Sequence, residues 1–150
     1  MFQQCNYIKN LPSLNKIKEM APGALGFAFG ASINKSISGS VELPNLTTIN
    51  SKVFCWTFQN CTNIYSAYIG GTGWSYDSGP NGAGGNITNM FKGCSNLSSI
   101  EVDWTSWPSG SCADNWVSGV AANGIFKKPA ALPTEFGTNR IPSGWTVINK

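Results

Sequence analysis

Residues that could perform acid–base or nucleophilic catalysis are scarce in this chain. Its 150 residues include no histidine and only seven carboxylates. Hydrolysis would require paired carboxylates, or a nucleophile beside a base. The nearest carboxylate pair, Glu101 and Asp103, lies on one predicted strand, where alternate side chains point to the same face. Such a pair is more typical of a solvated strand than of a hydrolase, and we predict that the protein is not an enzyme.

The five cysteines do not form a metal-binding pattern. No Cys-x-x-Cys pair occurs, and there is no histidine to complete a zinc shell. The glycine-rich stretch 70–85 is not followed by Lys-Ser or Lys-Thr, which excludes a phosphate-binding loop of that type. We therefore expect neither a metal nor a cofactor.

Three of the cysteines belong to a repeated motif that predicts the architecture. The block Phe-x-x-Cys-x-x-aliphatic occurs three times, and a Leu-Pro-x-Leu-x-x-Ile block begins at both Leu11 and Leu43. The spacings are 91 − 58 = 33 and 43 − 11 = 32 residues, so two independent motifs agree on one period. Phe29 marks a degenerate unit that lacks its cysteine. The three complete copies are Phe2, Cys5 and Ile8; Phe58, Cys61 and Ile64; and Phe91, Cys94 and Leu97.

After each cysteine, apolar residues follow the L-x-x-L-x-L spacing of a leucine-rich-repeat strand. The pattern predicts a leucine-rich-repeat-type solenoid, β-rich with short helical turns, of roughly three to four repeats plus a C-terminal cap. The alternative is an ordinary antiparallel β-domain with accidental similarity, because short apolar runs are ambiguous. Side chains alternate along a strand, so the outward positions, which we predict to bind a ligand, are Ser66, Tyr68, Ser99 and Glu101.

The repeated cysteines, Cys5, Cys61 and Cys94, should form a column inside the core. Their shared inward direction favours packed, reduced thiols over a disulfide bridge. Cys55 and Cys112 lie outside the motif and could pair, although an odd total leaves one free thiol.

Local patterns predict helical turns over residues 51–58 and 88–93, each with a capping residue in front. Residues 70–85 are dense in glycine and predict an inserted loop that forms neither helix nor strand stably. Its two aromatics, Trp74 and Tyr76, have no repeat core that obviously needs them. We therefore add them to the predicted ligand-binding residues, while noting that long loops are either functional or disordered.

The chain divides into a predicted repeat domain, 1–103, which carries the insertion at 70–85, and a C-terminal capping segment, 104–150. A short amphipathic helix is expected over 114–124 and an edge strand over the four residues from Trp145. Trp116, Phe126 and Trp145 should be the apolar contacts of the cap. The chain opens inside a repeat unit, which favours a fragment of a longer protein or an assembly whose partner covers that end.

Charge argues against several partners. The formal net charge is +3 and the basic residues are scattered, so a nucleic-acid footprint is not expected. The Lys127–Lys128 pair is interpreted as a solvated turn. No segment has the length of a transmembrane helix or the pattern of a signal peptide, so membrane insertion is not expected.

The block of Met90, Phe91, Cys94, Leu97 and Ile100 resembles the BspA-like leucine-rich repeats of bacterial surface proteins. The segment from Asn115 to Val147 resembles the closing segment that follows such repeats in proteins of gut bacteria and their phages. This resemblance implies adhesion or host interaction, or a place in a virion tail, and no enzymatic activity.

Together these features predict a non-catalytic binding or adhesion module of a bacterial surface protein or phage tail. Its partner would be a host protein or a glycan, and its location extracellular, on the bacterial cell surface or the virion. The alternative is a structural component that assembles with copies of itself.

Overall fold

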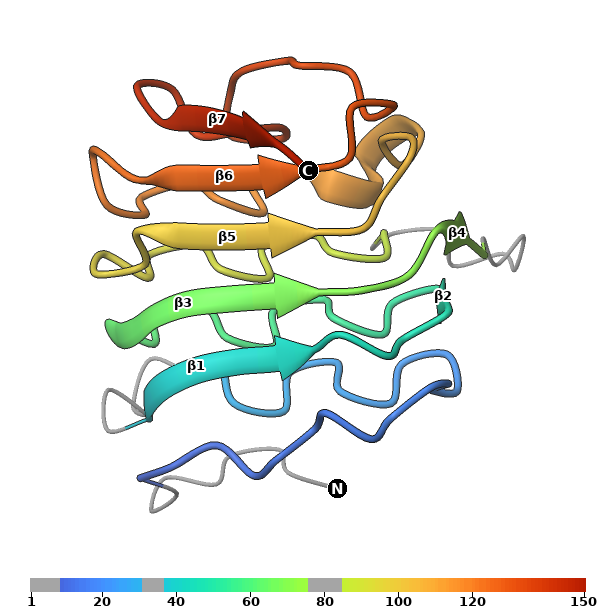
Figure 1. The fold of residues 1–150 in the computed structure, drawn as a ribbon. Coiled ribbons are helices and arrows are strands. Elements are labelled where there is room, and N and C mark those ends of the chain that lie inside the picture. The colour runs from blue at the N-terminus through green and yellow to red at the C-terminus, as the bar shows by residue number, and fades with distance from the viewer. Residues whose placement is uncertain (1–8, 31–36, 76–84) are drawn as a thin grey trace.

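A computed structural model describes residues 9–30, 37–75 and 85–150 of the chain. Its main element is one parallel sheet in the strand order β1-β3-β5-β6-β7 (Figure 1). A two-stranded parallel sheet, β2-β4, lies beyond the carboxyl ends of β1 and β3. The strands are β1 Ser38–Leu43, β2 Thr48–Ile49, β3 Asn63–Ile69, β4 Gly73–Trp74, β5 Ser99–Val102, β6 Ile125–Lys128 and β7 Thr146–Asn149.

This architecture corrects the prediction of a leucine-rich-repeat-type solenoid with short helical turns. The protein is a small, mostly-β domain built on a five-stranded parallel sheet. Its only regular helix among the described residues is the four-residue 3-10 helix η1, Gly110–Ala113. The helical turns expected over 51–58 and 88–93 and the helix expected over 114–124 are all absent from their described positions.

Residues in the left-handed region of backbone space explain why those helices do not form. Lys52, Trp56 and Asn60 have φ of 56°, 54° and 62°, so every fourth residue of this segment is incompatible with a right-handed helix. Asn115 and Gly119 repeat the pattern in the C-terminal segment, with φ of 53° and 75°. The chain instead makes successive tight turns.

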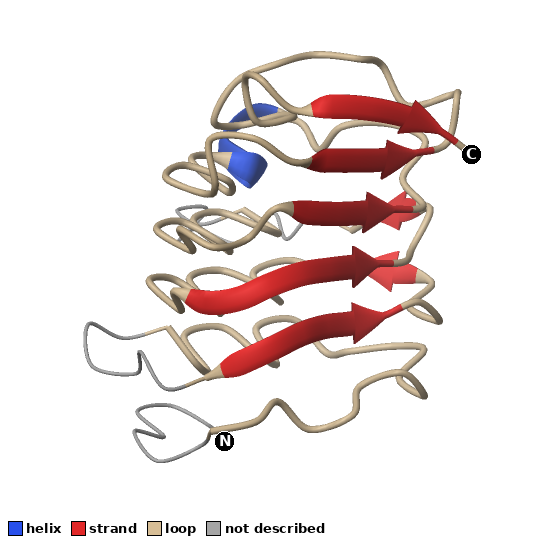
Figure 2. Cartoon of the chain, turned by 60° about the vertical axis from the view of Figure 1, so that its left-hand side comes forward, coloured by secondary structure: helices blue, strands red, loops and turns tan. Residues whose placement is uncertain are grey.

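These turns form a second backbone ladder behind the sheet, which we call the turn wall (residues 23–30, 51–60, 86–93 and 112–118). Alternate N–H groups donate to the neighbouring layer. Those between them donate three residues back within their own segment, as Thr57 N does to Phe54 O at 3.3 Å. Trp56 N donates to Thr88 O at 2.9 Å, and Phe58 N donates to Met90 O at 3.0 Å. Figure 2 shows the layers stacked on one another, with β1, β3, β5, β6 and β7 in one row and the turns on the other side.

The core lies between the sheet and the turn wall. Strand residues alternate as predicted: Ile100 and Val102 of β5 are fully buried, whereas Ser99 and Glu101 point outward. The motif phenylalanines stack in adjacent layers, with ring centroids 5.4 Å apart for Phe29–Phe58 and 5.5 Å for Phe58–Phe91. Phe29 therefore occupies the position predicted for it in a unit without cysteine.

The motif thiols are buried and reduced, as predicted for Cys61 and Cys94. Each donates to the carbonyl of the phenylalanine one layer below: Cys61 Sγ to Phe29 O at 3.5 Å and Cys94 Sγ to Phe58 O at 3.0 Å. Burial raises the pKa of Cys61 to about 12 and that of Cys94 further still. Cys55 and Cys112 are both free thiols. Phe2, Cys5 and Ile8 lie outside the described residues.

The predicted C-terminal segment 104–150 contributes β6 and β7 to the same sheet as β5. Trp116, Phe126 and Trp145 are buried, as predicted, and the expected final strand is β7. One prediction here is wrong. Lys128 is only 1% exposed. It comes one residue after Lys127, the outward partner of Glu101, so it points inward, and its ammonium donates to Leu132 O at 2.6 Å.

Candidate functional site

The outward face of the sheet brings together four of the predicted ligand-binding residues. Strand register places Ser66 beside Ser99 and Tyr68 beside Glu101. All four are partly exposed, and no described segment covers this face, which is toward the viewer in Figure 1. Parallel sheets are normally covered on both faces, so an open polar face on such a sheet is unusual.

Asp103 and Lys150, which were not predicted as ligand-binding residues, form a charged network with Tyr68 and Glu101 on this face. Lys150 Nζ lies 2.7 Å from Glu101 Oε1 and 2.7 Å from Asp103 Oδ1. Tyr68 Oη donates to Asp103 Oδ2 at 3.0 Å, and Lys150 Nζ lies 4.7 Å from the centre of the Tyr68 ring. We call Tyr68, Glu101, Asp103 and Lys150 the Lys150 cluster.

The cluster could be found from sequence only in part. Asp103 stands two positions after Glu101, so alternation indicates that both carboxylates share a face. Lys150 follows Glu101 by 49 residues and carries no motif. Only the pairing of β6 with both β5 and β7 brings the end of the chain to this place.

The cluster's environment holds its phenol and ammonium protonated. Burial raises the pKa of Tyr68, and its hydrogen bond to Asp103 adds to that effect. For Lys150, partial burial lowers the pKa, but the hydrogen bonds to Asp103 and Glu101 outweigh it and the net shift is upward. The cluster therefore carries two carboxylates and one ammonium, with several acceptor lone pairs left for a ligand's hydroxyl or N–H groups.

A hollow of about 490 Å³, the end hollow, adjoins this cluster through Asp103. It lies at the carboxyl ends of the strands, because Thr72 follows β3, Asp103 and Thr105 follow β5, and Pro129 follows β6. Its volume falls within the range of about 300–1,000 Å³ typical of small-ligand sites. Its wall combines threonine hydroxyls with apolar atoms, which suits a polar ligand of modest size.

Of the two loop aromatics, Trp74 does not join this site. Trp74 belongs to β4 and packs against the core, with its ring edge-on to Trp104 at 5.0 Å. Its Nε1 donates to Ser106 O at 3.0 Å. The prediction that no core needs Trp74 is therefore wrong, as is the prediction that residues 70–85 contain no strand. Tyr76 lies outside the described residues.

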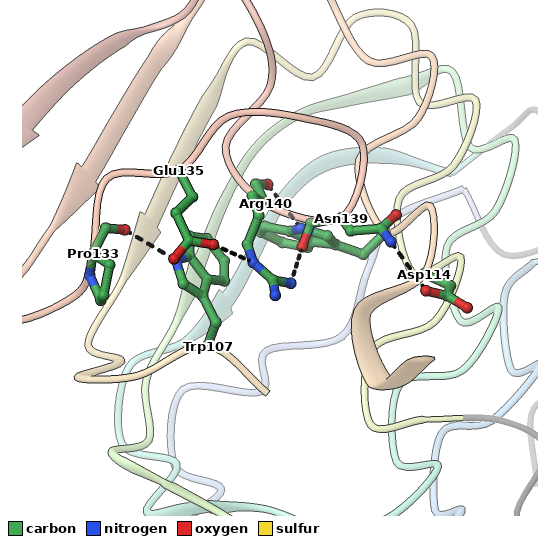
Figure 3. A network of polar contacts seen from close by, with 7 residues as sticks. Trp107, Asp114, Pro133, Glu135, Asn139 and Arg140 are labelled. Atoms are coloured by element: carbon green, nitrogen blue, oxygen red, sulfur yellow. Dashed lines mark hydrogen bonds and ion pairs between the residues drawn. The ribbon is translucent and has the colours of Figure 1, made fainter. Parts of the chain in front are cut away.

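A separate polar network ties the C-terminal segment together (Figure 3). Arg140 Nε lies 2.8 Å from Glu135 Oε2, and its guanidinium lies 5.4 Å from the Trp107 ring centre. Trp107 Nε1 donates to Pro133 O at 2.9 Å, and Asn139 Nδ2 donates to Asp114 Oδ1 at 3.0 Å. These contacts join residues 107–114 to residues 133–140 of the same segment, so we assign the network to folding of this segment.

The described residues include no group of three or more His, Cys, Asp and Glu side chains that could hold a metal ion. In the same ranges, no helix is long and apolar enough to span a membrane. The chain matches no protein-family model, and comparison with curated proteins and with solved structures also finds no match.

Proposed function

We propose that this protein is a non-catalytic binding module that recognises a protein or a glycan through the outward face of its sheet. The observation that carries the proposal is the Lys150 cluster, which stands on an uncovered parallel sheet and opens into the end hollow. Fixed charges and a tyrosine ring on a rigid sheet provide directional recognition without ordering a loop.

Extracellular placement on a bacterial surface or a virion remains part of the proposal. It is supported by the resemblance of the Met90–Ile100 block to bacterial surface proteins and by a surface that relies on Asn, Ser, Thr and Gly for polarity. Catalysis is disfavoured because Lys150 Nζ lies 2.7 Å from each carboxylate of the cluster. The two carboxylates are therefore not arranged as an acid and a base that face a substrate.

The test uses variants that preserve shape. Glu101→Gln and Tyr68→Phe should weaken binding to an immobilised panel of glycans and purified proteins, while the melting temperature changes little. Glu135→Gln is the matched control, because it removes the carboxylate of an exposed ion pair away from the sheet. Equal binding by Glu101→Gln, Tyr68→Phe and the native protein would exclude this face as the recognition surface.

A structural component that assembles with itself is the second candidate. Ile125 and Ile148 lie on the outward face of β6 and β7, each 40% exposed, and β7 is the last strand of the sheet. Light scattering over a concentration series should show a rise in mass if this edge joins copies. Ile148→Lys should then return the protein to a monomer, whereas a constant monomeric mass would exclude self-assembly.

A further inference from the structure

The ammonium of Lys150 lies in a position that three other side chains form around it. Its Nζ lies 2.7 Å from Glu101 Oε1, 2.7 Å from Asp103 Oδ1 and 4.7 Å from the centre of the Tyr68 ring, over that ring. Carboxylates and the face of an aromatic ring are groups that attract an ammonium. We call this position the ammonium seat (Tyr68, Glu101 and Asp103). Its occupant shows which functional group the seat accepts.

The Lys150 side chain can leave the seat without unfolding the sheet. The side chains of Lys150, Glu101 and Asp103 are 30%, 28% and 29% exposed, so water competes for all three. The backbone of Lys150 is held separately, because its N–H donates to Lys128 O at 2.9 Å. The ammonium stands on a flexible four-carbon stem. The side chain can therefore swing into solvent while β7 stays paired with β6.

The end hollow adjoins the seat and provides space for a larger molecule than an ammonium. Asp103 belongs to both, and its carboxylate is the one charged group among the described residues that line the hollow. Thr47, Thr72 and Thr105 also line it, and all three are exposed. Threonine hydroxyls both donate and accept hydrogen bonds. The hollow therefore matches a ligand with several hydroxyl groups and one positive charge.

From the seat and the hollow together we propose that this site takes an amino sugar of a glycan. The ammonium of the sugar replaces that of Lys150 in the seat, and the sugar ring lies in the end hollow against the threonine hydroxyls. This inference rests on the proposed binding function of the sheet face and names its ligand class. An acidic sugar would place its carboxylate against Glu101 and Asp103, and a neutral sugar would leave the seat to Lys150.

Lys150 is then an internal competitor of the ligand. The apparent affinity of a ligand falls in proportion to the fraction of protein molecules whose site is open. Partly exposed ion pairs are weak, so Lys150 fills the seat only a few times more often than it leaves it. Lys150→Ala should therefore tighten the binding of an amino sugar by about two- to sixfold.

Two sugars that differ in one charge supply the test. Glucosamine oligomers carry ammonium groups, whereas N-acetylglucosamine oligomers carry neutral amides at the same positions. Calorimetry should show that the native protein binds glucosamine oligomers at least about tenfold more tightly, because a charged hydrogen bond to a carboxylate is lost on acetylation. The gain from Lys150→Ala should be confined to glucosamine oligomers. Adding Asp103→Asn to Lys150→Ala should remove the preference between the two sugars.

Lys127→Ala is the matched control for Lys150→Ala. It removes the same charge from the same face, where Lys127 Nζ lies 4.0 Å from Glu101 Oε2 without filling the seat. Its effect on glucosamine binding should be smaller than that of Lys150→Ala. The melting temperature of each variant, which should stay near that of the native protein, establishes that the variants are folded.

Four results would overturn the proposal. The first is that neither the native protein nor Lys150→Ala binds glucosamine oligomers, or that both bind the acetylated oligomers equally well. The second is unchanged or weaker glucosamine binding by Lys150→Ala, so that Lys150 does not compete. The third is an equal gain from Lys127→Ala, which would indicate general charge attraction. The fourth is tighter binding of N-acetyl-lysine methylamide than of glucosamine oligomers by Lys150→Ala, which would make a lysine of a partner protein the occupant.

The proposed function has a separate outcome. If Glu101→Gln and Tyr68→Phe still weaken binding to the panel of glycans and proteins while glucosamine oligomers do not bind, the face is a recognition surface and only its ligand class is wrong. If those variants bind the panel as the native protein does, the recognition surface itself is excluded.

Discussion

The two sides of this molecule are built on different constraints. On the strand side, backbone pairing leaves alternate side chains facing solvent. These outward side chains differ in chemistry and include a hydroxyl, Ser66, a phenol, Tyr68, and a carboxylate, Glu101. On the turn side, backbone pairing between layers requires left-handed residues at regular positions, and asparagine or glycine occupies most of them. The strand side can therefore vary its chemistry at little cost to folding, whereas variation on the turn side costs stability.

The strongest expected effect lies in the core between the two sides. Phe91→Ala should lower the free energy of unfolding by about 3–5 kcal/mol, because it leaves a cavity in the ring stack. Phe91 lies 5.5 Å from Phe58 and 6.3 Å from Trp116, between ring centroids. Urea unfolding measures the change, and Phe136→Ala, at an exposed ring, is the control. A Phe91→Ala value as small as the control's would contradict the stack's role.

The buried thiols should make stability fall at high pH. Burial raises the pKa of Cys61 from 9.0 to about 12 and that of Cys55 from 9.0 to about 11. Above pH 9 the unfolded chain therefore loses thiol protons that the folded chain retains, so rising pH favours unfolding. Each thiol should lower the free energy of unfolding by about 1.4 kcal/mol per pH unit within its window.

Cys61→Ala isolates one thiol's part in this effect. Urea unfolding between pH 8 and pH 11 measures the free energy of unfolding of both proteins. The slope of this free energy against pH should be shallower for Cys61→Ala than for the native protein, by about 1.4 kcal/mol per pH unit above pH 9. Parallel curves for the two proteins would show that the Cys61 thiol is not shielded from water in the folded state.

A smaller loss of stability is expected on substitution of a left-handed residue of the turn wall. Asn115→Ala should cost about 1 kcal/mol, because alanine disfavours a φ of 53°. Asn115→Gly should cost less, since glycine adopts that conformation freely. Thermal unfolding of both variants gives the comparison. An alanine variant at least as stable as the glycine variant would show that the left-handed backbone at position 115 does not limit which residue is tolerated there.

The smallest effect is expected on the strand face. Lys150→Ala breaks contacts with Glu101 and Asp103, and all three side chains are about 30% exposed. We therefore expect the free energy of unfolding to fall by roughly 0.2–1 kcal/mol at low salt. High salt should reduce the loss further through screening. A loss as large as that of Phe91→Ala would mean that the cluster supports the fold, which would weaken its assignment to binding.

The local order of the core was accessible from sequence, but the class of fold was not. The phenylalanine and cysteine spacing predicted the Phe29–Phe58–Phe91 register and the buried thiols, because equivalent residues of a parallel stack lie above one another. The helical turns were predicted wrongly, since capping residues such as Thr88 suggested helix starts. In the structure the Thr88 hydroxyl instead donates to Ser111 O at 2.9 Å, in the next layer.

The candidate site shows the same division. Alternation along β3 and β5 was enough to predict that Ser66, Tyr68, Ser99 and Glu101 point outward. Trp74 was misplaced because its partner, Trp104, lies 30 residues away in sequence and no local pattern reports that contact. Lys128 was misplaced because charge alone predicts exposure, whereas alternation along β6 turns it inward, one residue after Lys127, the partner of Glu101.

Sequence by itself determined the repeat period, the inward and outward faces of the strands and the scarcity of catalytic groups, because each depends on residue type and on spacing along one segment. Tertiary structure alone decided the hydrogen-bond partners of the turns, the arrival of Lys150 beside Glu101 and the stacking of Phe27 on Trp56. The physical reason is common to all three. Each depends on contacts between segments about 20 or more residues apart in sequence, or on the end of the chain returning to the sheet. Local preferences do not encode such contacts.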